Sequence, residues 1–265
     1  MSEEFLFKAR TNEGYLFKVL TELLLQNIKT CCFVLTESDI SVRMTDNLKK
    51  ILIDMKLDSE NFQVYKFKYD SKKMIGLNLQ HLHKMLKSVK KKDTVEIFIK
   101  NNSDNDFGIK VIPKDNTRIT TSYIKIQNIQ NINVQLDTYY ENPQIILSND
   151  YQKMRKDMNG IGNLIEIQST ENTIKFICIA DGIYSREVEF GDKEEDESNN
   201  IVYQDTFFIE QLHKLIKLSG LGSKLYIYTN QNKPLYFKCN IGGIGVINIY
   251  IKSKSLIDEH NQENN

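Results

Sequence analysis

The sequence contains little proline, few cysteines and no long hydrophobic run. Only three of its 265 residues are proline, so long strands go uninterrupted and extended antiparallel sheets are favoured over a small barrel. No run reaches the roughly 18 apolar residues that a transmembrane helix needs, so we expect none. The N-terminus is acidic, with Glu3 and Glu4, and leads into no signal-like apolar block, so secretion is not expected.

The four cysteines are scattered and form no CxxC pair. They are Cys31, Cys32, Cys178 and Cys239. Neighbouring cysteines seldom bridge each other, so this pattern favours buried thiols in a reducing, intracellular compartment.

An excess of one charge is also missing. The chain has 35 basic and 35 acidic residues, a formal net charge of zero, which argues against a general nucleic-acid binder. The charges are segregated, however. Acids gather in 192–197 and 258–265, whereas Lys90, Lys91 and Lys92 are consecutive, so the distribution of charge matters more than its sum.

Motifs for catalysis or cofactor binding are lacking. No GxxxxGK[ST], HExxH or GxSxG occurs, and the glycine-rich stretch 242–245 has no helical pattern after it. The four histidines have no metal-ligand spacing with cysteines or acids. We therefore expect no enzyme, no metal and no cofactor. An enzyme built on a duplicated β-rich fold remains an alternative, which a screen for nucleotide binding or hydrolysis would test.

The chain does contain stretches in which apolar and polar residues alternate, as is typical of half-buried strands. The predicted strands are 40–43, 51–57, 63–69, 94–99, 108–112, 118–126, 144–147, 164–168, 174–179, 184–190, 201–206, 224–228, 235–241 and 245–251.

Four segments have helical period instead. Their apolar faces are Leu16, Val19, Leu20 and Leu23; Leu79, Leu82, Met85, Leu86 and Val89; Tyr151, Met154 and Met158; and Phe208, Leu212, Leu215 and Ile216. The second and fourth carry a near-identical hexamer, LHKMLK at 82–87 and LHKLIK at 212–217. We infer a duplication of a unit of about 125 residues, giving an α+β fold of two β-rich domains with two helices each on one sheet face.

The domain limits follow from composition. We predict an N-terminal domain over 1–126, a polar connecting loop over 127–142, a C-terminal domain over 143–254 and a disordered tail over 255–265.

Lysines recur three residues apart on the polar sides of three helices. The pairs are Lys84 and Lys87, Lys153 and Lys156, and Lys214 and Lys217; Lys18 occupies a comparable place on the first helix. A solvated polar face and a face that binds a polyanion both account for this pattern. These faces carry no aromatic stacking platform, so the polyanion we favour is the backbone of a nucleic-acid duplex.

Four segments in order resemble the eukaryotic sliding clamp family, proliferating cell nuclear antigen. Residues 7–24 are similar to its opening strand and helix, 76–99 to its second helix and following strand, 149–182 to the start of its second domain, and 205–254 to its last helix and closing strands. The resemblance implies the DNA-clamp fold, with three subunits closed head to tail into a ring whose helices line the hole. It places the subunit edges near 108–112 and 184–190, with Ile109, Val111, Tyr184 and Val188 at the interface.

The resemblance also implies a function: encircling duplex DNA and tethering replication and repair enzymes. The residues that match the family's DNA-facing positions are Lys18, Lys84, Lys87, Lys153, Lys156, Lys214 and Lys217. Those that match its partner-peptide pocket are Met44, Leu52, Ile132, Leu136, Tyr140, Pro234 and Tyr250.

The implied partners are double-stranded DNA, a DNA polymerase, a clamp loader and other proteins with short clamp-binding motifs, but no membrane. The implied assembly is a homotrimer, located in the nucleus or, for a viral protein, in a cytoplasmic replication compartment. Two alternatives are a subunit of a heterotrimeric checkpoint-type clamp and a monomeric clamp-fold accessory factor.

Overall fold

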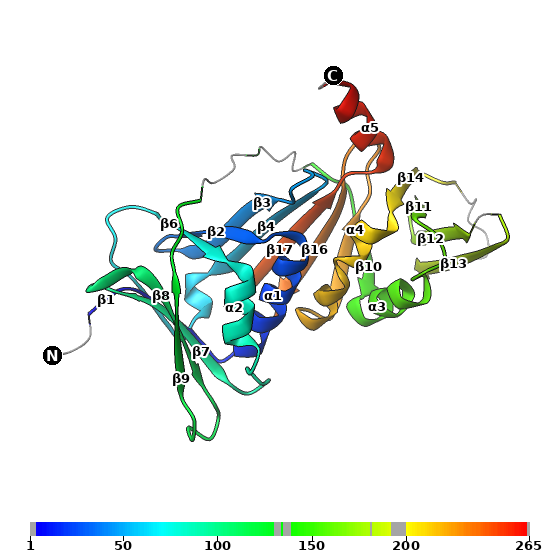
Figure 1. Cartoon of the computed structure of the whole chain (residues 1–265). Coiled ribbons are helices and arrows are strands. Elements are labelled where there is room, and N and C mark those ends of the chain that lie inside the picture. The colour runs from blue at the N-terminus through cyan, green and yellow to red at the C-terminus, as the bar shows by residue number, and fades with distance from the viewer. Residues whose placement is uncertain (1–3, 130–133, 135–138, 181, 192–199, 264–265) are drawn as a thin grey trace. The chain divides into compact units, whose positions relative to one another are not determined.

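The computed structural model describes residues 4–129, 134, 139–180, 182–191 and 200–263 (Figure 1). The chain forms two compact units. Unit 1 comprises Met1–Asp46, Ile53–Val134 and Asn240–Ile247, and unit 2 comprises Asn47–Leu52, Gln135–Cys239 and Asn248–Asn265. Each unit thus contains a short segment from a distant part of the sequence.

Unit 1 is built from two antiparallel groups of strands with two helices. Its elements are β1 (Phe5–Thr11), α1 (Gly14–Asn27), β2 (Thr30–Leu35), β3 (Asp39–Thr45), β4 (Ile51–Asp58), the 3₁₀ helix η1 (Ser59–Asn61), β5 (Val64–Phe67), β6 (Lys73–Asn78), α2 (Leu79–Leu86), β7 (Thr94–Lys100), β8 (Ser103–Ile112) and β9 (Thr120–Lys125). One group has the order β5-β1-β7-β8-β9, and the other has the order β4-β3-β2-β6.

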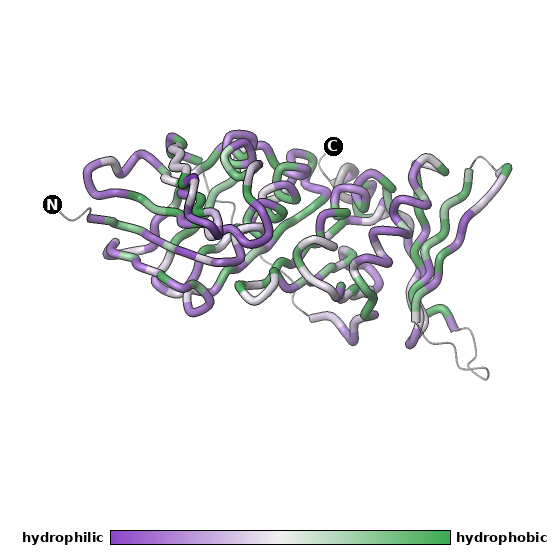
Figure 2. Tube along the Cα trace, turned by 90° about the horizontal axis from the view of Figure 1, so that it is seen from below, coloured by the Kyte–Doolittle hydropathy of each residue, from purple (hydrophilic) through white to green (hydrophobic). Residues whose placement is uncertain are grey.

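The helices of unit 1 pack against each other, each with one apolar face buried. In α1 the buried residues include Leu16, Val19, Leu20 and Leu23, the spacing that places side chains on one side of a helix. Helix α2 begins at a side-chain cap, because the Asn78 Oδ1 accepts a hydrogen bond from the His81 N–H at 3.1 Å. Figure 2 shows hydrophobic and hydrophilic residues within the same helices and strands, as expected for elements with one buried side.

Unit 2 repeats this organisation. Its elements are β10 (Gln144–Leu147), α3 (Ser148–Asp157), β11 (Leu164–Ser169), β12 (Thr173–Ala180), β13 (Tyr184–Gly191), β14 (Tyr203–Phe208), α4 (Ile209–His213), the 3₁₀ helix η2 (Ile216–Gly220), β15 (Lys224–Tyr228), β16 (Leu235–Ile241), β17 (Gly245–Ile251) and α5 (Lys254–Glu263). Strands follow the orders β13-β12-β11-β14 and β10-β15-β16-β17, and α3 packs on η2.

The fourth predicted helix differs from expectation, because it is split. After α4 the backbone hydrogen bonds shorten from four-residue to three-residue steps. The Lys214 N–H donates to the Glu210 carbonyl, whereas the Leu215 and Leu218 N–H groups donate to Leu212 and Leu215. The repeated hexamer therefore lies within and just after α2 in unit 1 but spans α4 and η2 in unit 2.

The prediction of a disordered tail over 255–265 is wrong for most of that range. Helix α5 covers Lys254–Glu263, its Ile257 side chain is buried, and the Ser255 hydroxyl donates to the Asp205 carboxylate on β14 at 3.2 Å. The polar composition concealed this, because one buried aliphatic residue and a few hydrogen bonds hold the helix.

The predicted sheet edge at 108–112 is also wrong. Strand β8 pairs with β7 on one side and with β9 on the other, so its backbone groups are already used. Ile109 and Val111 are buried, at 1% and 6% exposure, and cannot face a partner. The edge strand is β9, the next strand along the chain. Strand β13 does lie at a sheet edge, as expected.

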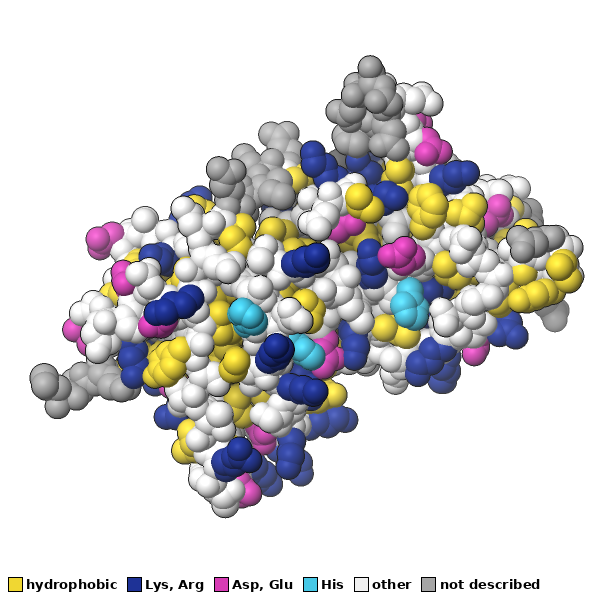
Figure 3. All heavy atoms as spheres, viewed as in Figure 1, with side chains coloured by type: hydrophobic (Ala, Val, Ile, Leu, Met, Phe, Trp, Pro, Cys, Tyr) yellow, Lys and Arg dark blue, Asp and Glu magenta, His cyan; other side chains and the backbone are white. Residues whose placement is uncertain are grey.

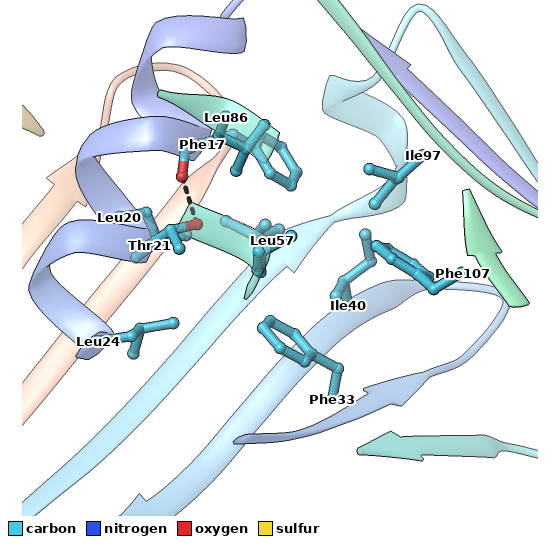
Figure 4. A pocket seen from close by; sticks show the side chains of 11 residues that line it. Phe17, Leu20, Thr21, Leu24, Phe33, Ile40, Leu57, Leu86, Ile97 and Phe107 are labelled. Carbon is cyan, nitrogen blue, oxygen red and sulfur yellow. Dashed lines mark hydrogen bonds between the residues drawn. The ribbon is translucent and has the colours of Figure 1, made fainter. Parts of the chain in front are cut away.

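Unit 1 contains a small cavity beneath α1, shown in Figure 4. It has a volume of about 30 Å³ and is lined mainly by apolar side chains, among them Leu20, Leu24, Phe33 and Ile40. Its hydroxyl, on Thr21, already donates to the Phe17 carbonyl at 2.8 Å. The cavity is too small for an organic ligand and offers water few partners, so it is a packing defect. Among the described residues, no helix has the length and apolarity to cross a membrane.

Candidate functional site

The predicted lysines of unit 1 lie on the paired helices α1 and α2. The Lys18 Nζ on α1 donates to the carbonyl oxygen of Lys87, the residue that ends α2, at 2.9 Å. This contact connects the two helices and brings the cations of both together. Figure 3 shows basic and histidine side chains gathered over α2.

Two of these cations are available to a ligand. Lys84 and Lys87 are exposed, and neither forms an ion pair within the described part of the chain. The neighbouring acid, Glu22 on α1, lies 3.4 Å from the His83 Nε2. The helix pair therefore presents a cationic surface with few acids to neutralise it.

In unit 2 the lysines divide into paired and unpaired cations. Lys153 lies 2.9 Å from Asp150 one turn earlier on α3, and the pKa of Lys153 is raised, mainly by this hydrogen bond. Lys214 lies 3.5 Å from Glu210. Lys156 is exposed on α3 and has no ion pair with any residue that the structure describes.

Lys217 is half-buried on η2, the element against which α3 packs. The structure thus brings Lys18, Lys84 and Lys87 onto one helix pair and Lys153, Lys156 and Lys217 onto the other. Exposed pairs such as Lys153 with Asp150 are weak and exchange readily for a phosphate contact. Lysine on helix surfaces binds phosphates without reading base sequence.

A second feature is a ladder of tyrosines in unit 2. The rings of Tyr228 and Tyr236, opposite each other on β15 and β16, stack with centroids 4.5 Å apart, and Tyr236 and Tyr250 stack at 4.6 Å. Tyr140 tilts against Tyr236 at 5.2 Å, and its hydroxyl donates to the Pro234 carbonyl at 2.9 Å. Burial raises the pKa of Tyr228, so its hydroxyl stays protonated.

The ladder brings together three of the residues predicted to form the peptide pocket. Tyr140, Pro234 and Tyr250 meet there. Leu52 is half-buried at the start of β4, in the short segment Asn47–Leu52 that belongs to unit 2. Met44 belongs to unit 1, where it is buried and its sulfur accepts a hydrogen bond from the Cys32 N–H. Ile132 and Leu136 lie outside the described residues.

Sequence reasoning missed Tyr228 and Tyr236, which form the middle of the ladder. A signal was present. Buried Leu225 and Ile227 alternate with tyrosines on β15, so Tyr228 faces outward, and the same holds for Tyr236 between Leu235 and Phe237. Of the predicted interface residues, Tyr184 is exposed and Val188 half-buried on β13.

The described side chains include no group of three or more histidines, cysteines, aspartates or glutamates arranged to hold a metal ion. The four cysteines are buried and form no disulfide with one another. The candidate sites among the described residues are thus two kinds of surface: cationic helices in both units and an aromatic ladder in unit 2.

Two family models together match almost the whole chain. The model for the N-terminal domain of proliferating cell nuclear antigen matches residues 6–137, and the model for its C-terminal domain matches residues 136–254. The chain belongs to the proliferating cell nuclear antigen family. The two β-rich units are the two duplicated domains of its α+β clamp fold.

Relatives from distant organisms support this family assignment. A protein named probable DNA polymerase sliding clamp 1, from Paramecium bursaria Chlorella virus 1, is 23% identical over 254 residues, which is 93% of this chain and 96% of that protein. The proliferating cell nuclear antigen of Chaetomium thermophilum is 22% identical over 262 residues, 96% and 100% of the two chains. The DNA polymerase sliding clamp of Pyrococcus horikoshii is 31% identical over 167 residues, 63% and 64%.

The fold itself matches a solved clamp. The crystal structure of the Entamoeba histolytica proliferating cellular nuclear antigen aligns with a TM-score of 0.82 at 19% identity, covering 94% of this chain and 99% of that one. The names of these relatives support a sliding-clamp role in DNA replication. Clamps of this family are non-catalytic processivity factors, consistent with the expectation that this chain is not an enzyme.

Proposed function

We propose that three copies of this chain close into a ring around duplex DNA and tether replication enzymes to it. The observation that carries the proposal is the exposed, unpaired lysines on paired helices of both units, Lys84 and Lys87 in unit 1 and Lys156 in unit 2. A ring that holds DNA by topology needs only weak, salt-sensitive phosphate contacts, which also permit sliding.

Two open sheet edges support assembly. In the five-stranded sheet, β5 is a four-residue edge bearing exposed Lys66, whereas β9 has six residues and carries half-exposed Tyr123. In the four-stranded sheet, α5 packs on the edge strand β14, which leaves β13 open. Short or covered edges resist pairing. Because β9 and β13 belong to different units, pairing β9 of one copy with β13 of the next is a heterologous contact, which closes a ring when its rotation permits.

Threading on DNA tests the ring without a loader. A linear duplex is fixed at one end, the protein is added, the free end is capped with a bulky protein, and the duplex is washed in high salt. An encircling ring is retained on capped duplex and lost from uncapped duplex. Equal loss from both would contradict the proposal.

The lysine assignment has its own test in the same assay. We expect Lys84→Glu with Lys156→Glu to keep the wild-type mass in light scattering but to reduce the amount threaded severalfold. The control is Lys66→Glu with Lys72→Glu, which makes the same charge change at exposed lysines away from these helices. Unchanged threading of the first variant at low salt would show that the assigned DNA face is wrong.

The mass of the protein in solution also distinguishes a homotrimer from the alternative assemblies. Light scattering on a sizing column should give three times the chain mass of 30.9 kDa. A mass of one chain would favour a monomeric accessory factor or a subunit that needs different partners, such as a heterotrimeric checkpoint-type clamp.

The tyrosine ladder supports the tethering role, because stacked aromatic rings offer anchors for aliphatic and aromatic side chains of a partner peptide. Tyr236→Ala should weaken binding of such a peptide in fluorescence polarisation. Tyr236→Phe keeps the ring of the stack and removes the hydroxyl that donates to Asn248, so it should bind nearly as the wild type does. Equal binding by all three proteins would remove the ladder from the partner site.

A further inference from the structure

A basic groove lies in unit 1, outside the surfaces described above. It is formed by the turn between α2 and β7 and by the turn between β8 and β9, and it has a volume of about 890 Å³. Five cations line it: Lys90, Lys91, Lys92, Lys114 and Arg118. All five are exposed, and none forms an ion pair within the described part of the chain.

The two acids of the groove offset only part of this charge, and the turns hold both of them in place. Asp93 accepts the backbone N–H of Lys90 at 2.9 Å. The Asp115 carboxylate accepts the backbone N–H and hydroxyl of Thr117 at 3.2 and 2.9 Å. Five clustered cations repel one another, and the groove focuses their positive potential, so it favours an anionic occupant.

The place of the groove in the fold indicates which occupant. Thr117, Arg118 and Thr120 line it, and Thr120 is the first residue of β9, the open edge proposed to pair with β13 of another copy. Strands β8 and β9 pair antiparallel in unit 1, as do β12 and β13 in unit 2, and antiparallel pairing is the commoner arrangement. Antiparallel pairing sets the end of β13, Gly191, beside the beginning of β9, and hence beside the groove.

The sequence that follows Gly191 is strongly acidic. Residues 192–197 read DKEEDE, five acids and one lysine. Six residues reach at most about 20 Å, enough to cross a groove of this size. Parallel pairing would instead carry these acids toward Lys125, which already lies 2.7 Å from Asp106. Charge complementarity therefore selects the antiparallel arrangement.

We propose that the basic groove of one copy binds the acidic segment 192–197 of the next copy, as an electrostatic latch at each subunit boundary. The proposal rests on the ring proposed above. It assigns to Lys90, Lys91, Lys92, Lys114 and Arg118 a role in assembly, separate from the lysines on the helices.

Charge reversal and rescue test the latch. The groove variant is Lys91→Glu with Lys92→Glu, the segment variant is Glu194→Lys with Glu195→Lys, and the combined variant carries all four changes. Light scattering across a dilution series gives the concentration at which the assembly dissociates. We expect each reversal to raise this concentration about tenfold at low salt. Because every copy supplies one groove and one segment, the combined variant should return to the wild-type value.

Two further comparisons sharpen the result. The control Lys66→Glu with Lys72→Glu should dissociate as the wild type does, and high salt should shrink the difference between the wild type and the single reversals. Circular dichroism should show that all variants are folded, since every altered groove residue is exposed.

Three outcomes would overturn the latch. If both reversal variants form trimers that dissociate at the wild-type concentration, the latch is refuted and the ring is not. Loss of assembly without rescue in the combined variant would show that these residues do not face each other. A groove variant with unchanged mass but weakened binding to a short duplex would make the groove a nucleic-acid site. A wild-type monomer at every concentration would instead refute the ring itself, and the latch with it.

Discussion

At the scale of single residues, Arg155 is the least expected side chain in unit 2. It is fully buried, and its Nη2 donates to the Ile209 carbonyl at 3.2 Å. Its Nε and Nη1 atoms have no hydrogen-bond partner among the described residues. A buried cation with so few partners costs desolvation free energy that one hydrogen bond does not offset.

We therefore predict that Arg155→Met is neutral or raises the free energy of unfolding by about 1 kcal/mol. Methionine fills a similar volume and needs no hydrogen bond. Urea unfolding followed by circular dichroism measures the change. A loss of more than about 2 kcal/mol would show that the guanidinium has partners that stabilise it.

The buried thiols give a pH prediction. Burial raises the pKa of the Cys239 thiol from 9.0 to about 12. Between these values the unfolded chain has released this proton while the folded chain still holds it. The unfolded state then binds fewer protons, so this group makes the free energy of unfolding fall as pH rises above about 9, with no effect at lower pH.

Cys239→Ala isolates that contribution, because alanine does not titrate. In urea unfolding at pH 8 and at pH 10 (about one unit on either side of the unfolded pKa), the wild type should lose more stability than the variant does. Equal losses would show that the thiol titrates alike in both states.

At the scale of elements, helix α2 depends on its cap. Asn78→Ala removes the acceptor of the His81 N–H and should lower the free energy of unfolding by about 1 kcal/mol. Asn78→Asp keeps an acceptor and should cost much less. The same ordering should appear in hydrogen exchange of the first turn of α2. A destabilised Asn78→Asp variant would indicate that the amide nitrogen matters as well.

The sequence predicted most strands and all four amphipathic segments, because one buried face imposes a regular period. The alternation pattern missed β1, β2 and β6, of which only β1 was implied by the family resemblance. In β2 the run Thr30–Leu35 is nearly all apolar and does not alternate, and β6 includes Gly76, where a Cβ would meet the Gln127 carbonyl oxygen. The length of the fourth helix also escaped prediction, since hydrophobic spacing does not distinguish α4 from the 3₁₀ turns after it.

The candidate sites were predicted unevenly for a similar reason. Lysine spacing identified the helix faces, and the structure supplies what spacing cannot: Lys153 and Lys214 form ion pairs with acids, whereas Lys84 and Lys156 form none among the described residues. The tyrosine ladder depends on the register of β15 with β16, which no local pattern reveals. The error at Ile109 was one of strand order, a long-range property.

At the scale of the whole molecule, the two units do not correspond to two halves of the sequence. Unit 1 is completed by Asn240–Ile247. Within it the Asp58 N–H donates to the Ile244 carbonyl at 3.1 Å, and Ile241 and Ile244 are buried. A chain of residues 1–134 lacks this segment and would leave apolar surface uncovered.

We predict that residues 1–134 alone show no cooperative urea transition, whereas the same fragment with residues 238–249 attached by a flexible linker does. Circular dichroism and sizing chromatography would measure the difference. A cooperative transition in the shorter fragment would show that the segment is dispensable.

This exchange of segments has a consequence during translation. Residues 240–247 leave the ribosome after every other segment of unit 1, so unit 1 stays incomplete until they have been made. Unit 1 therefore cannot follow the usual order, in which an N-terminal domain folds first as it is synthesised. Unit 2 likewise includes Asn248–Asn265, so both units are completed late, and a ribosome that stalls before residue 240 leaves a product that quality-control proteases can recognise.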